Sequence, residues 1–226
     1  RAGRLAPGLC LRLWNEAQHR TRADFDEPEI RRVDLAGACL ALYNWFDADP
    51  EAFEWYEPPE QAALRRAQTL LADLGFIEEG VITPAGRQAA RLPLHPRLAR
   101  LLMESRERGH LELGALCAAL LSERSPFLRG GAGRRSGGAR SSLSAHWESD
   151  PLERARALRA WKEERGGDQT PFGEIHRDAA RTIFRVAEQT AREAERTLGG
   201  EPNSDAFSEE EAIGQALLLA YPDRLA

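Results

Sequence analysis

The sequence predicts a mainly α-helical fold, in which a winged helix with a small β-hairpin precedes a helical bundle. Five apolar residues recur at the spacing of one helix face: Leu64, Ala67, Leu70, Leu71 and Leu74. Gly75 follows, where a helix needs a left-handed C-cap, and two short apolar pairs then flank Glu78-Glu79-Gly80. After residue 95 nearly all of the ordered pattern is helical.

Residues 58–96 contain the order of elements expected of a winged helix. Pro58-Pro59 is expected in the first helical turn, where the N–H that proline lacks would be unpaired anyway. Phe76-Ile77 and Val81-Ile82 are predicted to form the hairpin, and Thr83-Pro84 to cap and begin another helix. Helix, glycine stop, hairpin and second helix thus follow one another directly.

The chain before this stretch predicts one strand and several short helical pieces. Gly8–Trp14 alternates as a strand, and because a lone strand is unstable we expect it to be the edge of a larger α/β domain upstream. Asn15–Phe25 is predicted to be one short helix, and acids around Pro28 favour another helix start. Apolar residues surround the helix predicted over Leu35–Phe46, so this helix should be buried. Three aromatic residues are expected to dock on the core: Phe53, Trp55 and Tyr56.

The second half of the chain predicts a bundle. Its helices are expected from His95 to Gly109, Leu113 to Leu121, Asp150 to Trp161, Gly173 to Leu198 and Glu209 to Ala220. Residues 129–142 form a Gly/Arg loop that should be flexible, because it has almost nothing to bury. Two interpretations of this loop stay open: a solvated insertion, or a nucleic-acid contact through Arg134, Arg135 and Arg140.

The composition fits a soluble globular protein of one or two domains, with 226 residues, 42% of them apolar and 30% charged. No apolar run approaches the roughly 20 residues of a membrane span, and no segment resembles a signal peptide, so we expect a cytoplasmic protein with no membrane partner. Cys10, Cys39 and Cys117 lie far apart, which favours reduced, buried thiols over a disulfide or a metal site. The net charge of −5 leaves room only for a local basic stripe.

The chain contains 31 basic residues, and Lys162 is the one lysine among them. It lies in a helical context, whereas a nucleotide-binding P-loop needs Gly-Lys-Ser/Thr after a strand. The chain therefore has no P-loop of its own, and we expect it to bind no cofactor by itself.

A row of arginines follows one arc of the last long predicted helix, spanning about 100° at the usual helical rotation: Arg177, Arg181, Arg185, Arg192 and Arg196. The apolar residues predicted on the opposite side are Ile175, Ala179, Ile183, Val186, Thr190 and Ala194. A basic ridge on a helix packed by its other face suits contact with a phosphate backbone.

Acidic residues divide this ridge into two halves. Glu188 and Glu195 share the arc and should neutralise Arg192 and Arg196, whereas only Glu174 and Asp178 intrude on the first half. The candidate phosphate contacts are therefore Arg177, Arg181 and Arg185, with a solvated helix face as the alternative interpretation.

Several stretches resemble DEAH-box ATP-dependent RNA helicases. Arg1-Ala2-Gly3-Arg4 looks like the tail of helicase motif VI, QRxGRAGR, and residues 28–35 resemble the PEI-x-R-x-D-L start of the family's winged helix. Residues 58–96 match the PP…A…LLxxLG…G-x-LT-x-x-GR-x-x-A-x-LPLHPRL signature nearly throughout. Residues 92–99 and the closing Ala220–Arg224 point to the bacterial HrpB-type branch.

The resemblance implies a C-terminal part of a larger helicase. Residues 1–27 would be the tail of the second RecA-like domain, 28–95 the winged helix, and 96–226 a ratchet-like helical bundle. The parent would hydrolyse ATP with Mg and act on single-stranded RNA, or alternatively DNA, with its upstream RecA-like domains as partners. Arg1 and Arg4 match the motif VI arginine fingers, which stabilise charge on the transferring phosphoryl group, in the parent only.

A second interpretation is a winged-helix DNA-binding transcriptional regulator with a helical dimerisation domain. Such a protein needs basic residues on its recognition helix and wing. The wing tip here carries Glu78-Glu79, which phosphates repel, and the helix offers Arg65 and Arg66 against several acids. This charge pattern favours the helicase interpretation.

Overall fold

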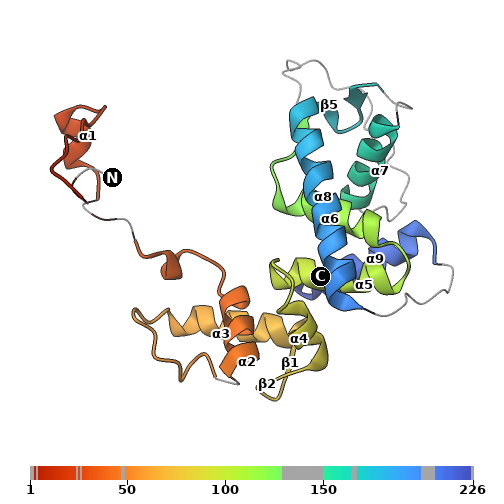
Figure 1. The fold of residues 1–226 in the computed structure, drawn as a ribbon, viewed down its shortest axis with the longest axis horizontal. Helices are drawn as coiled ribbons and strands as arrows, with labels where there is room; N and C mark the ends of the chain where they lie inside the picture. Colours follow the sequence, from red (N-terminus) through yellow and green to blue (C-terminus); the bar gives the residue numbers. More distant parts are fainter. Residues whose placement is uncertain are drawn as a thin grey trace, which may run out of the picture.

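The computed structural model of the chain describes residues 3, 5–23, 25, 27–46, 49–128, 150–163, 167–199 and 207–224. In the first part the elements are α1 (Glu16–Arg20), the 3₁₀ helix η1 (Glu29–Arg31), α2 (Ala36–Phe46), α3 (Gln61–Asp73), β1 (Ile77–Glu78), β2 (Val81–Ile82) and α4 (Pro84–Ala89). The second part comprises α5 (Pro96–Glu107), α6 (Leu111–Ser122), β3 (Phe127–Leu128), α7 (Asp150–Lys162), β4 (Gln169–Thr170), β5 (Gly173–Ile175), α8 (Arg177–Leu198), α9 (Glu209–Ala220) and η2 (Pro222–Arg224). The predicted mainly helical class is confirmed (Figure 1).

Helix α3 ends at the predicted glycine cap. Gly75 has φ +70°, and its N–H donates to the Ala72 carbonyl at 2.8 Å while the Phe76 N–H donates to the Leu71 carbonyl at 2.9 Å. These two bonds form a Schellman motif, which satisfies carbonyls that the helix end leaves without partners. The predicted apolar face is buried throughout, from Leu64 to Leu74.

The hairpin after this cap is a two-residue turn between β1 and β2. Ile77 pairs with Ile82, and both Glu79 and Gly80 have positive φ, as a type I′ turn requires. Thr83 closes the hairpin: its hydroxyl donates to the Gly75 carbonyl at 2.7 Å and accepts from the Gly86 N–H at 3.0 Å. The order helix, glycine stop, hairpin and helix is therefore present.

Several predictions for the first part need correction. Pro58-Pro59 was predicted in the first helical turn, but it precedes α3, whose N-cap is Glu60 and whose first residue is Gln61. Residues 7–13 have no regular structure, since no strand in the described part of the chain pairs with them, so the predicted strand is not formed there. The predicted helix over Asn15–Phe25 is the shorter α1. Acids around Pro28 start only the short η1.

The aromatic residues of the connector between α2 and α3 divide into two groups. Trp55 is half-buried, donates from Nε1 to the Pro50 carbonyl at 2.9 Å, and packs edge-on against Phe53 with ring centroids 5.1 Å apart. Tyr56 is fully exposed, so its predicted docking on the core is wrong. Helix α2 is buried only on one side: Ala36, Cys39 and Leu40 are inside, whereas Trp45 is 76% exposed.

Helix α5 is packed between the first part and the bundle (Figure 1). It contacts α2 and α4 on one side and α6, α8 and α9 on others. Gly114 of α6 lies so close to α5 that a Cβ atom there would approach Ser105 to 2.3 Å. One apolar core therefore extends without interruption from Leu35 before α2 to Ala220 in α9.

A second small sheet was not predicted from the sequence. Strand β5 pairs antiparallel with β3 and β4, and it begins at Gly173, where the pattern predicted the start of a long helix. Ile175, expected on the helix face, is buried in this strand beside Phe127 of β3. The helix α8 itself starts at Arg177, with the His176 side chain accepting from the Ala179 N–H.

Residues of the family-like motifs contact one another around the start of α5. His95 lies 3.5 Å from Asp34. Arg97 donates to both carboxylate oxygens of Asp223, at 2.6 and 2.9 Å, and to the Ala220 carbonyl at 3.1 Å. Its side chain is only 16% exposed, and a bidentate arginine–carboxylate pair in such a place is geometrically specific. This pair fixes the end of α9 on the start of α5.

Charged side chains also join α7 to the start of α9. Arg156 pairs with Glu153, Glu209 and Glu210, and Arg159 donates to Glu209 at 2.7 Å. Burial lowers the pKa of Arg156, but the three carboxylate hydrogen bonds outweigh it and raise the value. Hydrogen bonding from Arg159, and to a smaller extent from Arg156, holds the pKa of Glu209 below its ordinary value.

Because Gly75 is left-handed and Gly37 is helical, an alanine should change the free energy of unfolding in opposite directions at these two positions. Gly75→Ala should lower the free energy of unfolding by about 1 kcal/mol, because a Cβ at φ +70° is strained. Gly37→Ala in α2, where a Cβ meets open space, should raise it by about 0.5 kcal/mol. Urea denaturation of both variants checks this, and equal effects at the two sites would remove the cap assignment.

The lowered pKa of Glu209 predicts a pH-dependent contribution to stability. A carboxyl whose pKa is depressed on folding stabilises the protein above its unfolded pKa, and this contribution is lost as the pH falls through the folded value. Glu209→Gln should therefore cost about 1 kcal/mol at neutral pH, a modest figure because Arg159 is 43% exposed.

The cost of Glu209→Gln should vanish in acid, where the parent carboxyl is itself protonated. Denaturant titrations at neutral and acidic pH measure both values. Glu195→Gln, at an exposed position of α8, is the matched control for the loss of one negative charge. A Glu209→Gln cost that persists unchanged in acid contradicts the ion-pair explanation.

Candidate nucleic-acid interface

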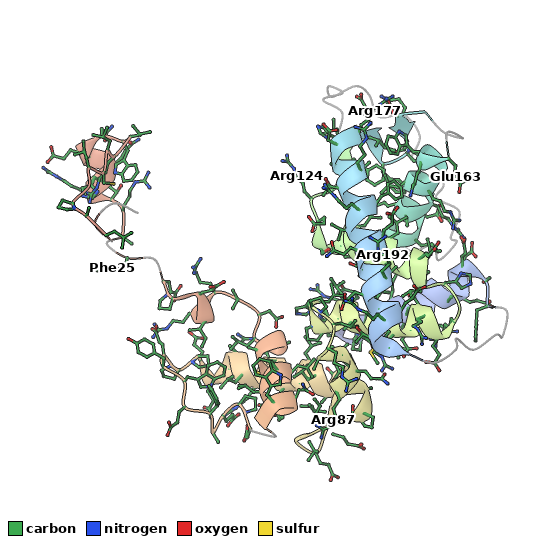
Figure 2. The ribbon with its side chains drawn as sticks, viewed as in Figure 1. Phe25, Arg87, Arg124, Glu163, Arg177 and Arg192 are labelled. Carbon is green, nitrogen blue, oxygen red and sulfur yellow. The ribbon has the colours of Figure 1, made fainter. Side chains whose placement is uncertain are left out.

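Helix α8 displays the predicted arginine ridge to solvent. Arg177 is 65% exposed and Arg181 71% exposed at their side chains, and Arg185 is also exposed. Figure 2 shows Arg177 at one end of the helix and Arg192 farther along it. With a rise of 1.5 Å per residue, the three candidate arginines are spaced about 6 Å apart along the axis. The structure therefore places Arg177, Arg181 and Arg185 on one accessible face.

The buried face of α8 differs from the predicted one. The buried side chains of this helix are Ala180, Ile183, Ala187, Ala191 and Ala194. Ala179, Val186 and Thr190, predicted to point inward, are only half-buried. Four of the five buried residues are alanines, whose small side chains let α8 approach α6 closely. Compared with the predicted inward face, the buried face of α8 therefore lies closer around the helix to the arginine ridge.

Each arginine in the first half of the ridge has a polar neighbour. Arg177 donates to Asp168 Oδ2 at 2.9 Å, Arg181 to Asp178 Oδ1 at 3.3 Å, and Arg185 to the Thr182 hydroxyl at 3.3 Å. Exposed pairs of this kind contribute little, about 0–1 kcal/mol, so a phosphate competes readily for the guanidinium groups.

Asp168 was not predicted as part of this surface. Its carboxylate accepts from Arg177 of α8 and, at 2.8 Å, from Trp161 Nε1 of α7. The hydrogen bonds from Arg177 and then Trp161 hold the pKa of Asp168 below its ordinary value. Asp168 precedes β4, in the sheet that the sequence did not reveal, and no local spacing rule brings it to Arg177.

In the second half of the ridge, Arg196 has a different acidic partner from the predicted one. Arg196 pairs with Glu193, and Glu188 pairs with Lys162 of α7 at 3.0 Å. The hydrogen bond from Lys162 lowers the pKa of Glu188, and Arg192 adds a smaller electrostatic contribution. Arg196 thus pairs with Glu193 rather than with the predicted Glu195, and Glu193 was missed because it lies about 60° outside the arc.

A hollow of about 710 Å³ lies beside the first half of the ridge. Four cationic side chains line it, Lys162 and the three candidate arginines, together with Asp168 and Glu188. Two aromatic residues complete its lining: Trp161 from α7 and Phe184 from α8. Phe184 is seven residues after Arg177, so the helical spacing places it about 20° from Arg177, just beyond the edge of the arginine arc.

The other predicted site residues lie outside the described residues: Arg1, Arg4, Arg134, Arg135 and Arg140. The Gly/Arg loop over residues 129–142 lies there as well. Within the described part of the chain, no group of three or more His, Cys, Asp or Glu side chains is arranged to hold a metal ion. No helix of that part has the length and apolar character to cross a membrane.

The two buried cysteines, Cys39 and Cys117, have unreactive thiols. Burial raises the pKa of Cys39 to about 11 and that of Cys117 to about 12. Because the thiolate is the reactive form, neither side chain suits a nucleophile at neutral pH. Cys10 is exposed, so the prediction of three buried thiols holds for two.

Comparison with known proteins finds relatives that are named as ATP-dependent RNA helicases. The chain is 33% identical over 132 residues to the ATP-dependent RNA helicase HrpA of Escherichia coli, with 56% of this chain and 10% of that protein covered. It is 36% identical over 123 residues to the ATP-dependent RNA helicase HrpB of the same organism, covering 54% and 15%. It is 34% identical over 163 residues to the human probable ATP-dependent RNA helicase DHX34, covering 71% and 14%. The chain is a homologue of the DEAH-box RNA helicases.

The fold agrees with this relationship. The crystal structure of the E. coli DExH-box NTPase HrpB matches with a TM-score of 0.56 and 24% identity, over 98% of this chain and 22% of that one. At this identity the match shows a shared fold. No family model matches the chain. The chain thus spans only a small share of its helicase relatives' length.

Proposed function

We propose that this chain is the accessory C-terminal region of an ATP-dependent DEAH-box RNA helicase, and that α8 couples the motor to single-stranded nucleic acid. The observation that carries the proposal is the row of Arg177, Arg181 and Arg185 on an exposed helix whose other side is fixed in the core. The relatives, which are named as ATP-dependent RNA helicases, support the choice of RNA, with single-stranded DNA as the alternative ligand.

The geometry of the ridge suits a backbone contact without base readout. Arginine forms bidentate bonds with phosphate oxygens, and its side chain is long enough to follow a strand that bends. The cations repeat along the helix about every 6 Å. Because phosphates are present in every sequence, a strand held in this way stays free to move through the site, as an enzyme that acts along RNA requires.

The chemistry of the motor belongs to the parent protein in this proposal. The parent binds ATP and Mg in its upstream RecA-like domains, and Arg1 and Arg4 act there as arginine fingers towards the transferring phosphoryl group. The chain contributes a RecA-like tail over residues 1–27, a winged helix over 28–95 and a ratchet-like bundle over 96–226. The continuous core around α5 supports a firm mechanical connection between the last two.

The regulator alternative has one observation in its favour. Arg65 and Arg66 of α3 are exposed, as a DNA-recognition helix requires. The wing, however, presents Glu78 and Glu79 to solvent, and their charge opposes a phosphate contact at that position. The experiment below therefore includes the α3 surface as a matched control.

Replacing the ridge arginines should weaken binding and flatten its salt dependence. In the triple variant Arg177→Gln, Arg181→Gln, Arg185→Gln, helix propensity stays close to that of the parent chain. Each lost phosphate contact lowers the slope of log affinity against log salt by about 0.7, so the slope should fall by about 2 in total. Fluorescence anisotropy with labelled oligouridylate at several salt concentrations measures the affinity and the slope.

The matched control removes three exposed arginines from the predicted winged helix: Arg65→Gln, Arg66→Gln and Arg91→Gln. It changes the net charge equally and should leave the slope within error of the parent value. An unaltered slope in the ridge variant would show α8 to be a solvated face. A loss confined to the control variant, with duplex DNA as the preferred ligand, would favour the regulator alternative.

The chain by itself should not hydrolyse ATP. Its one lysine lies in α7 rather than in a glycine-rich loop after a strand, so no lysine is available to hold the β- and γ-phosphates. Phosphate release by the purified 226-residue chain, with and without oligouridylate, should match the buffer blank. Turnover that copurifies with the chain and disappears in Arg4→Ala would contradict this expectation.

A further inference from the structure

An aromatic ring lies at the edge of the arginine ridge. Phe184 is a half-buried residue of α8, about 20° around the helix from Arg177, and it lines the 710 Å³ hollow beside Arg177 and Arg181. It also lines a neighbouring hollow of about 650 Å³ between α6, α7 and α8. The ring therefore stands at the place where the two hollows meet.

Lys162 of α7 covers this ring in the present structure. Its Nζ atom lies 4.7 Å from the centroid of Phe184 and 3.0 Å from Glu188 Oε1. The two charged side chains are 53% and 55% exposed, so both contacts of the lysine are at the surface. Lys162, like Phe184, lines both hollows.

The charge of the larger hollow favours an anionic ligand. Four cationic side chains line it against two carboxylates, and Asp168 is already engaged by Trp161 and Arg177. A nucleotide of a single strand combines a phosphate with a flat aromatic base, which matches cations placed around a ring. A volume of about 710 Å³ lies within the usual range of small-ligand pockets, about 300–1,000 Å³.

We propose that the hollow between α7 and α8 is a base-binding subsite for single-stranded nucleic acid. One base stacks on Phe184 in place of the Lys162 ammonium group, and Lys162 turns to the adjoining phosphate as a fourth cation beside the three ridge arginines. This proposal rests on the proposed function and deepens it, because it adds a sequence-tolerant base contact to a backbone contact.

The free energies involved favour replacing the Lys162 ammonium group on Phe184 by a base. An exposed cation–π contact changes an equilibrium by about twofold to fivefold, and an exposed ion pair by at most about fivefold. Stacking of one base on an aromatic side chain changes binding by about 5- to 150-fold. At the middle of these ranges the base gains more than the lysine loses from both contacts together, and the lysine recovers part of its loss at a phosphate.

The test compares a base-bearing ligand with a base-free one. Phe184→Leu keeps an apolar side chain of similar size but removes the aromatic face, and it should weaken binding of labelled oligouridylate about tenfold with an unchanged salt slope. Binding of an abasic oligomer with the same backbone should stay within twofold of the parent value. Phe184→Trp should restore or strengthen oligouridylate binding.

The control substitution is Phe53→Leu, at a partly exposed ring of the predicted winged helix, which should change neither affinity. Melting curves of all variants identify any loss that comes from unfolding. If Phe184→Leu does unfold, Lys162 gives the second measurement, because it is the one lysine of the chain. Oligouridylate should slow acetylation of Lys162 in the parent chain, and the abasic oligomer should slow it less.

The outcomes separate this proposal from the one before it. If the ridge triple variant loses affinity while Phe184→Leu binds like the parent, the subsite is refuted and the backbone contact stands. Equal losses for oligouridylate and the abasic oligomer likewise refute base stacking. If the ridge triple variant keeps its affinity and salt slope, the proposed function itself fails.

Discussion

Helix α5 buries side chains towards both parts of the molecule, and the remaining elements are arranged around that buried surface. Leu98 and Ala99 and, one turn later, Leu101 and Leu102 are all buried. Because α2 and α4 pack on one side and α6, α8 and α9 on the others, α5 cannot shift without opening the core on several sides. Gly114 sets the closest approach to it, since α6 has no side chain at that position.

The polar contacts at the start of α5 add direction to this packing. Apolar burial is not directional, whereas the forked bond of Arg97 with Asp223 allows only one orientation of the two groups. The same turn of α5 reaches the first part of the chain through His95 and Asp34. Residues at both ends of the described core are thereby held to one helical turn.

Local rules predicted the elements that depend on local causes. Gly75 is identifiable because a left-handed cap excludes most other residues. Helix α9 has the predicted bounds because Ser208 is a typical capping residue at its start and Pro222, which cannot continue a helix, follows its end. The hairpin is equally local. By contrast, the strand β5 exists because β3, far away in the chain, pairs with it, and no short window contains that information.

The candidate site shows the same division. The arc of arginines follows from helical geometry alone, and the same spacing would have placed Phe184 beside Arg177. The partners Asp168 and Lys162 come from a turn and from another helix, so only the fold brings them to α8. The inward face of α8 was misplaced because the prediction gave weight to Val186 and Thr190, while close packing against α6 selected alanines.

The double role of the Thr83 hydroxyl has a consequence for how this chain can vary. It joins the end of α3 to the start of α4, so the segment between Gly75 and Thr83 is a closed ring of fixed circumference. Added residues can be accommodated only at the tip, around Glu79 and Gly80, because an insertion within either strand would turn Ile77 or Ile82 outward. Length variation among homologous chains should therefore avoid this hairpin and accumulate in connections whose ends are not tied to each other.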